Sequence, residues 1–248
     1  MSCCAHEHDG DCGDMSRRGM LGLSGLGLGL GLASLYGFSA PAEAQVLTSE
    51  MRAALTPQQI VDHILEGNRR FVAGTPKSRD WLAEQKGTAQ GQHPAAIFLS
   101  CVDSRAPVEV VCDFGIGQAF NARVAGNAVN DDILGSMEFA TAVAGAKVVM
   151  VMGHTACGAI KGAIDGARLG NLTLLLARFQ NAIQETEFSG ERTGSNPAFV
   201  DAVAKTHVTM SLDLIRERSP VLRDLERDGK IKIVGAMYDL ESGQVALV

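Results

Sequence analysis

Two short motifs carry side chains of the types that bind transition metals. Cys101 opens a C-x-D-x-R motif, and His154 and Cys157 form an H-x-x-C motif further along the chain. Two thiolates and one imidazole are a recognised zinc ligand set, which leaves a fourth position open for water or substrate. Considered alone, each cysteine would more often be a buried apolar residue, and the histidine would more often be a loop residue whose ring nitrogens are hydrogen-bonded. Together, the two motifs predict a catalytic zinc ion bound by Cys101, His154 and Cys157.

Each motif begins where a short apolar run ends. Residues 95–100 (AAIFLS) precede Cys101, and residues 147–152 (KVVMVM) precede the second motif. Continuous apolar runs of this length are typical of strands buried on both faces of a parallel sheet. Residues 120–124 form a weaker strand candidate. Because ligand sites in open parallel sheets collect at the carboxyl ends of the strands, we expect the two motifs to meet there.

Helical patterns separate these runs. Thr56-Pro57, followed by apolar residues at helical spacing, is typical of a capped helix start. Asn130 precedes a second apolar segment with acids in its first turn. Further helices are expected at about 158–165, 172–185 and 197–217. Residues 230–237 and 244–248 flank a Glu-Ser-Gly turn and predict a hairpin. The fold class is therefore α/β, a mostly parallel central sheet flanked by helices with an antiparallel hairpin at its C-terminal edge.

The composition excludes some classes of partner. The chain has 248 residues, 46% hydrophobic and 20% charged, with a formal net charge of −6. This is the composition of a soluble domain, and a mildly acidic chain lacks the basic surface that nucleic acid or an anionic membrane attracts. Six cysteines are too few for a disulfide scaffold at this length. Three of them lie in a Cys/His-rich tract at residues 3–12, to which we assign no site.

The N-terminus has the layout of a signal peptide. Arg17-Arg18 precede an uncharged, glycine-rich run at residues 20–38, and Ala42-Glu43-Ala44 supplies a small-x-small cleavage site. Paired arginines before a mildly hydrophobic run indicate the twin-arginine export route. We therefore expect residues 1–44 to be removed after Ala44, a periplasmic or otherwise exported location, and one catalytic domain over residues 45–248 without membrane attachment. An uncleaved anchor is the alternative, because the run is just long enough to span a bilayer.

Four segments together resemble the β-class carbonic anhydrases. They are C-V-D-S-R at 101–105, A-R-V-A-G-N at 122–127, L-G-S-M-E-F-A at 134–140 and G-H-T-A-C-G at 153–158. The resemblance covers most of residues 55–240. It implies a zinc lyase that interconverts carbon dioxide and bicarbonate, with one Zn²⁺ per chain on the three ligands named above. It also implies that Asp103 and Arg105 form the neighbouring dyad, and that the chain is a homodimer or a higher homo-oligomer.

Hydration of carbon dioxide gives Asp103 and Arg105 separate tasks. Zinc lowers the pKa of its bound water toward about 7, which supplies hydroxide, but two thiolates make it a weaker Lewis acid than three histidines would. Asp103 can accept the hydroxide's proton and so aim its lone pair at the substrate. Arg105 can hold Asp103 bidentately and keep it off the metal. A released Asp103 would become the fourth ligand and displace the water.

The residue at position 98 bears on regulation. Bicarbonate-regulated relatives carry Trp three positions before the first zinc cysteine. This chain has Phe98 there, so we expect the open, unregulated form.

The resemblance also assigns three residues to substrate binding. Gln92 lies where the family has a glutamine that hydrogen-bonds a substrate oxygen, and Phe120 matches an aromatic residue that lines the pocket. Phe139 falls where plant-type members have Tyr, so any role that needs the hydroxyl is lost. A pocket for an apolar gas should be mostly apolar with a few placed polar groups, which this set would supply. Core packing is the alternative for the two phenylalanines.

Other interpretations stay open. Some relatives hydrolyse carbon disulfide or carbonyl sulfide, and tunnel shape decides between such substrates. A closed, non-catalytic zinc-binding protein would use Asp103 as a permanent fourth ligand. The presence of Arg105 and Gln92 argues against this alternative. The redox alternative is a disulfide between Cys101 and Cys157. The nearby His154 favours a metal site over this disulfide. Cys112 has no ligand-type neighbours and is expected in the core. No histidine is assigned as a proton shuttle.

Overall fold

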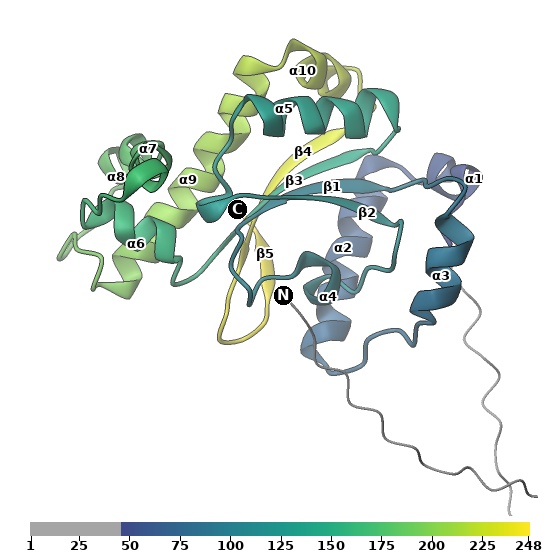
Figure 1. The fold of residues 1–248 in the computed structure, drawn as a ribbon, viewed down its shortest axis with the longest axis horizontal. Helices are drawn as coiled ribbons and strands as arrows, with labels where there is room; N and C mark the ends of the chain where they lie inside the picture. The colour runs from purple at the N-terminus through teal and green to yellow at the C-terminus, as the bar shows by residue number, and fades with distance from the viewer. Residues whose placement is uncertain (1–45) are drawn as a thin grey trace, which may run out of the picture. The chain divides into compact units, whose positions relative to one another are not determined.

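The computed structural model describes residues 46–248, so the expected signal peptide lies outside the described residues (Figure 1). The helices and strands follow in the order α1 (Ser49–Ala54), α2 (Pro57–Val72), α3 (Trp81–Thr88), β1 (Ala96–Ser100), α4 (Val108–Val111), β2 (Ala119–Arg123), η1 (Ala125–Asn127), α5 (Asp131–Glu138), η2 (Phe139–Val143), β3 (Val148–His154), α6 (Gly158–Ile164), α7 (Gly170–Ala177), α8 (Gln180–Glu185), α9 (Pro197–Arg218), α10 (Pro220–Arg227), β4 (Lys232–Tyr238) and β5 (Val245–Leu247).

The five strands form one sheet in the order β2-β1-β3-β4-β5. The β2-β1, β1-β3 and β3-β4 pairs are parallel, and β4 and β5 pair antiparallel. Every residue of β1 and β3 is buried, as their apolar runs predict for central strands covered on both faces. The predicted fold class is thereby confirmed, including the antiparallel pair at the C-terminal edge.

Alternate residues of the central strands face two separate hydrophobic clusters. Phe98 of β1 packs in the cluster that includes Ile64 of α2. Its neighbour Leu99 points to the opposite face, where the cluster includes Met137 of α5 and Leu222 of α10. Figure 1 shows the same division, with α5 and α10 along one side of the sheet and α2 and α4 along the other. The helices packed on the two faces of the sheet hold β1 and β3 rigidly side by side.

Both predicted helix starts are capped as expected. Thr56 and Gln59 form a capping box at α2, in which each side chain accepts from the other residue's backbone N–H. Asn130 accepts from the N–H of Ile133 at 2.9 Å and begins α5. The helix expected over 172–185 is instead two helices, α7 and α8, separated at Arg178 and Phe179. The fully buried Phe179 side chain breaks the regular spacing because it packs into the core.

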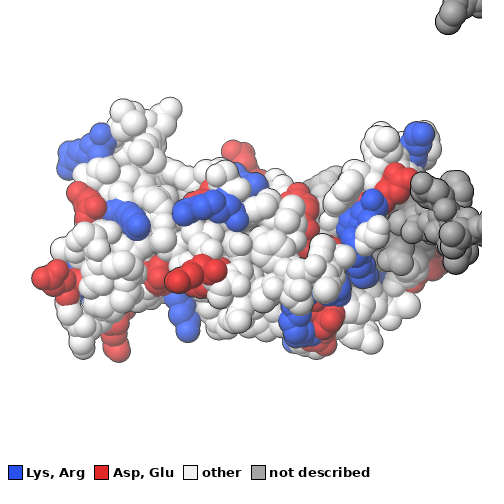
Figure 2. Space-filling view, turned by 90° about the horizontal axis from the view of Figure 1, so that it is seen from below, with Lys and Arg blue, Asp and Glu red and all other residues white. Residues whose placement is uncertain are grey.

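Surface charge and the burial of Cys112 bear on the other residues of interest in the described part of the chain. Figure 2 shows Lys and Arg interspersed with Asp and Glu over one face. Among residues 46–248, no helix has the length and apolarity of a membrane span. Cys112 is 1% exposed in the cluster beneath α2, and burial raises the pKa of its thiol to about 12. Cys112 is therefore a core residue, as predicted.

His207 of α9 is a buried imidazole that should make stability depend on pH. Its ring lies edge-on to Phe179 with centroids 4.7 Å apart, and burial lowers its pKa from 6.5 to about 4. The unfolded chain therefore binds this proton at a higher pH than the folded chain does. The free energy of unfolding should be unaffected by this group above pH 6.5 and should fall by about 3 kcal/mol between pH 6.5 and 4.

Urea unfolding of an H207Q variant across this pH range measures the effect. The slope of unfolding free energy against pH should be flatter in H207Q than in the parent. H63Q, which replaces an exposed imidazole on α2, is the matched control and should keep the parental slope. Equal slopes in H207Q and the parent would contradict the assignment.

Candidate metal centre

The three predicted ligands meet at the carboxyl ends of β1 and β3. Cys101 directly follows β1, His154 is the last residue of β3, and Cys157 caps the start of α6. Ser100, the last residue of β1, is the register partner of Met152, so β3 extends two residues further and ends at His154. The Sγ atoms and an imidazole nitrogen lie within 4.8 Å of one another, and all three residues are buried. The sheet thus brings together side chains from two motifs that are distant in sequence.

The donor set fits a zinc ion. Nδ1 of His154 lies 2.8 Å from the Thr155 carbonyl oxygen, which can only accept, so Nδ1 carries the proton. Nε2 therefore presents its lone pair, and it is buried with no hydrogen-bond partner in the described part of the chain. A buried, unpartnered ring nitrogen beside two buried thiols is the arrangement that a metal ligand set requires. Cys101, His154 and Cys157 would hold the ion.

The two thiols differ in acidity because of their hydrogen bonds. Hydrogen bonding from Cys157 and from the N–H of Gly126 lowers the pKa of Cys101. That N–H lies 3.2 Å from the sulfur of Cys101. The same pairing with Cys101, together with burial, raises the pKa of Cys157. The hydrogen-bonded pair therefore favours one thiolate, and metal binding would release the remaining thiol proton.

Asp103 lies beside the ligand cluster but is held by Arg105. The guanidinium donates from Nε to Oδ1 at 3.0 Å and from Nη2 to Oδ2 at 2.8 Å, and the Arg105 backbone N–H donates to Oδ1 at 2.9 Å. These bonds keep the pKa of Asp103 well below its usual range. Oδ2 is 3.8 Å from Nε2 of His154. The carboxylate is therefore ionised, oriented and close enough to act on a group bound at the metal position.

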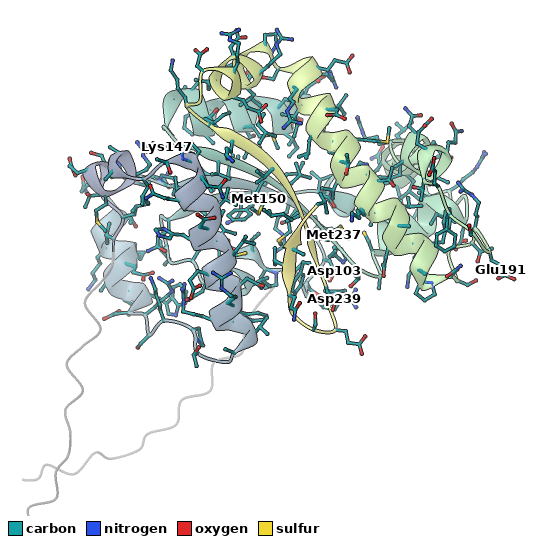
Figure 3. All side chains as sticks on the ribbon, turned by 180° about the vertical axis from the view of Figure 1, so that it is seen from behind. Asp103, Lys147, Met150, Glu191, Met237 and Asp239 are labelled. Atoms are coloured by element: carbon teal, nitrogen blue, oxygen red, sulfur yellow. The ribbon has the colours of Figure 1, made fainter. Side chains whose placement is uncertain are left out.

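The site lies at one end of the sheet. In Figure 3, the labels of Asp103, Met237 and Asp239 lie toward the carboxyl end of β4, whereas that of Lys147 lies toward the other end of the sheet. This agrees with the register, in which His154 pairs with Tyr238 and Val148 pairs with Lys232. The parallel strands therefore present their carboxyl ends to the candidate site, as predicted.

Two neighbouring residues outside the predicted ligand, dyad and substrate-binding sets also shape the site. Arg123, at the end of β2, donates to the backbone carbonyls of Cys101 and Asp103 and so fixes the loop that carries both. Gly126 supplies the N–H to the Cys101 sulfur from a left-handed conformation with φ of 65°. Both residues belong to the 122–127 segment that contributed to the family resemblance, and that segment was the sequence feature that could have identified them as part of the site.

The structure does not bring the three predicted substrate-binding residues to this cluster. Gln92 is exposed in the loop before β1, at the opposite end of that strand from Cys101. Phe120 pairs with Ile97 across the edge of the sheet, and its ring lies edge-on to Phe139 with centroids 6.1 Å apart. Phe139 is 54% exposed, so core packing does not explain it. Their roles in substrate binding stay predictions.

Comparison with known proteins places this geometry among described folds and families. A family model described as "Carbonic anhydrase" matches residues 96–245. "Carbonic anhydrase 2" of Mycobacterium tuberculosis is 33% identical over 184 residues, which cover 73% of this chain and 88% of the relative. The β-carbonic anhydrase CafA of Aspergillus fumigatus superposes with a TM-score of 0.61 at 24% identity, over 76% of this chain and 90% of that one. One of two tetrameric β-carbonic anhydrases from Sordaria macrospora also gives 0.61, at 22% identity over 77% and 97% of the two chains.

Proposed function

The chain belongs to the β-class carbonic anhydrases, and on that premise we propose that it hydrates carbon dioxide reversibly in an open form, with Arg105 holding Asp103 away from the metal. The observation that carries this proposal is the pairing of a buried Cys-His-Cys cluster, in which Nε2 of His154 has no partner among the described residues, with a carboxylate that arginine already binds bidentately. A closed, non-catalytic site would need Asp103 among the ligands.

The residues divide the chemistry as follows. A zinc ion held by Cys101, His154 and Cys157 would supply the Lewis acidity that makes water nucleophilic near neutral pH. Asp103 is ionised and can only accept, so it would accept a hydrogen bond from that nucleophile and orient its lone pair toward carbon dioxide. Arg105 sets the carboxylate's orientation through its two side-chain donors and its backbone N–H. Apolar neighbours of the two thiols, including Ile160 and Ala128, keep bulk water from the ligands.

The open form also agrees with the surroundings of Phe98. This side chain is fully buried in β1 and packs edge-on to Phe114, with ring centroids 5.7 Å apart. It offers no hydrogen-bond donor where bicarbonate-regulated relatives have an indole N–H.

The substrate is tested by comparing two linear triatomic molecules. We expect the purified protein to hydrate carbon dioxide and to release little sulfide from carbon disulfide. Sulfide release without carbon dioxide hydration would assign the site to the alternative hydrolase chemistry.

We also propose that the protein functions as a homo-oligomer. The solved structures from Sordaria macrospora are tetrameric. This chain exposes Phe139, whose ring contacts Phe120 of the edge strand β2, and Val143, four residues further along η2, at 54% and 75%. Contiguous exposed apolar side chains favour association. Sedimentation equilibrium should give at least twice the chain mass, and a monomer at micromolar concentration would contradict the proposal.

The export proposal rests on Arg17-Arg18, the glycine-rich run and the Ala42-Glu43-Ala44 site. The twin-arginine route carries folded proteins, so folding and zinc loading would precede translocation and protect the thiolates from oxidation. Replacing both arginines with lysine should strand the protein in the cytoplasm, as measured by fractionation and immunoblotting. Exported parent protein should begin at Gln45.

An R223K/R227K variant, altered at two exposed arginines of the catalytic domain, is the control and should be exported normally. Normal export of the R17K/R18K variant would refute the twin-arginine proposal.

A further inference from the structure

We propose that Asp201 of α9 positions the zinc ligands by holding the turn that joins His154 to Cys157. The inference rests on the Cys-His-Cys zinc site described above. Oδ1 of Asp201 accepts the backbone N–H of Ala156 at 2.7 Å, across 45 residues of sequence. Asp201 is not one of the clustered ligand residues, so it would act through the turn rather than on the metal itself.

The turn needs an external support because of its backbone conformation. Ala156 has a φ of 54°, in the left-handed region that a residue with a Cβ rarely adopts. Such a conformation persists only where the surrounding structure holds it. The preceding residue, Thr155, is tied to the end of β4, because its N–H donates to the Tyr238 carbonyl and its Oγ1 accepts from the N–H of Leu240. Asp201 fixes the next step of the chain, directly before Cys157.

Helix α9 can carry this role because it packs directly against the site. Val200 and Ala204, on either side of Asp201, lie in the same hydrophobic cluster as both cysteine ligands. Gly153 immediately precedes His154, and a Cβ there would lie 2.7 Å from Cγ2 of Val208. The absent side chain therefore allows α9 to approach the end of β3. The packing places Asp201, which is partly exposed, on the turn of α9 that faces the ligand loop.

The carboxylate oxygen of Asp201 lies 2.7 Å from the Ala156 nitrogen, so the position of an acceptor oxygen there holds the turn. By fixing the φ of Ala156, it fixes where the Cys157 sulfur lies relative to Nε2 of His154. Groups that orient metal ligands from outside the ligand set commonly change metal affinity by about 10- to 100-fold when removed. Loss of Asp201 should therefore weaken zinc binding without removing any ligand.

The experiment measures zinc affinity by competition with a chromogenic chelator. D201A should bind zinc about 10- to 100-fold more weakly than the parent. D201N should stay close to the parent, because its amide oxygen can accept the same N–H. D201E keeps the charge but displaces the oxygen, so it should bind zinc more weakly than D201N. D213A, which removes a carboxylate that is 78% exposed on the same helix, should keep the parental affinity.

A second readout reports the geometry of the ligands. In cobalt-substituted protein, the thiolate-to-cobalt absorption should shift in D201A and D201E and should match the parent in D201N. The loss of zinc affinity caused by D201A should also be smaller in an A156G background, because glycine adopts the left-handed conformation freely.

Three results would overturn the proposal: parental zinc affinity in D201A, weaker binding in D201N than in D201E, or an equal effect of D201A with and without A156G. If D201A does not fold, the ranking of D201N against D201E decides. These measurements follow metal binding alone, so they stand whether or not the protein turns over carbon dioxide.

Discussion

Replacing Arg105 with alanine should lower carbon dioxide turnover on the order of 100-fold or more, while zinc stays bound. Arg105 provides three of the hydrogen bonds on Asp103, and two of them come from the side chain that the substitution removes. The freed carboxylate, already 3.8 Å from Nε2 of His154, can then become the fourth ligand and exclude water. Stopped-flow hydration assays and elemental analysis measure the two quantities on the same sample.

R105K is the matched control for this prediction. Lysine keeps the positive charge but cannot form the bidentate pair, so its turnover should lie between those of the parent and R105A. Turnover of R105A should recover in part as pH rises, because hydroxide then competes better with the carboxylate. Parental turnover in R105A, or loss of zinc from it, would show that Arg105 does not hold Asp103 off the metal.

Replacing His154 or Cys101 with alanine should abolish zinc binding and reduce hydration to the uncatalysed background. The ligand atoms lie within 4.8 Å of one another, and removing one leaves too few to hold a catalytic ion in competition with buffer. The substituted protein should also lose the increase in melting temperature that zinc gives the parent, because a ligand stabilises only the state that binds it. Elemental analysis and calorimetry measure these effects.

C112A separates loss of a ligand from loss of a buried cysteine. Cys112 is as buried as the ligands but lies in the cluster beneath α2, so C112A should keep one zinc per chain and its turnover, even if its unfolding free energy falls. Full zinc occupancy in H154A or C101A would remove that residue from the ligand set.

The sequence predicted the parts of the fold that depend on local pattern. The apolar runs that became β1 and β3 are buried on both faces, and Asn130 caps α5 as its position before the acidic turn indicated. Convergence of Cys101 with His154 followed from a general property of parallel sheets rather than from either motif alone. For this reason the ligand set could be predicted without a structure.

The parts that sequence patterns missed depend on tertiary contacts. The one buried residue of helix α3 is the charged Glu84, which forms an ion pair with Arg79 at 3.1 Å. Because no apolar residue of α3 is buried, its sequence shows no apolar periodicity. The split between α7 and α8 follows from the insertion of Phe179 into the core beside Gly126. Asp201 reaches the ligand turn from a helix distant in sequence, and nothing near it in the chain marks it as part of the site.

The substrate-binding roles of Gln92, Phe120 and Phe139 were predicted by resemblance, and they stay predictions, because these residues lie apart from the Cys-His-Cys cluster within one chain. Gln92 precedes β1, whereas Cys101 follows it, so the strand itself separates them. Motif matching transfers residue types but does not by itself place side chains in space.

The central claim is that a buried Cys-His-Cys zinc site with an arginine-held aspartate hydrates carbon dioxide. Titrating zinc into metal-free protein while following hydration by stopped flow tests it most directly. We predict that turnover rises in proportion to bound zinc and reaches its maximum at one ion per chain. Full zinc occupancy without hydration, or undiminished hydration in metal-free protein, would contradict the account.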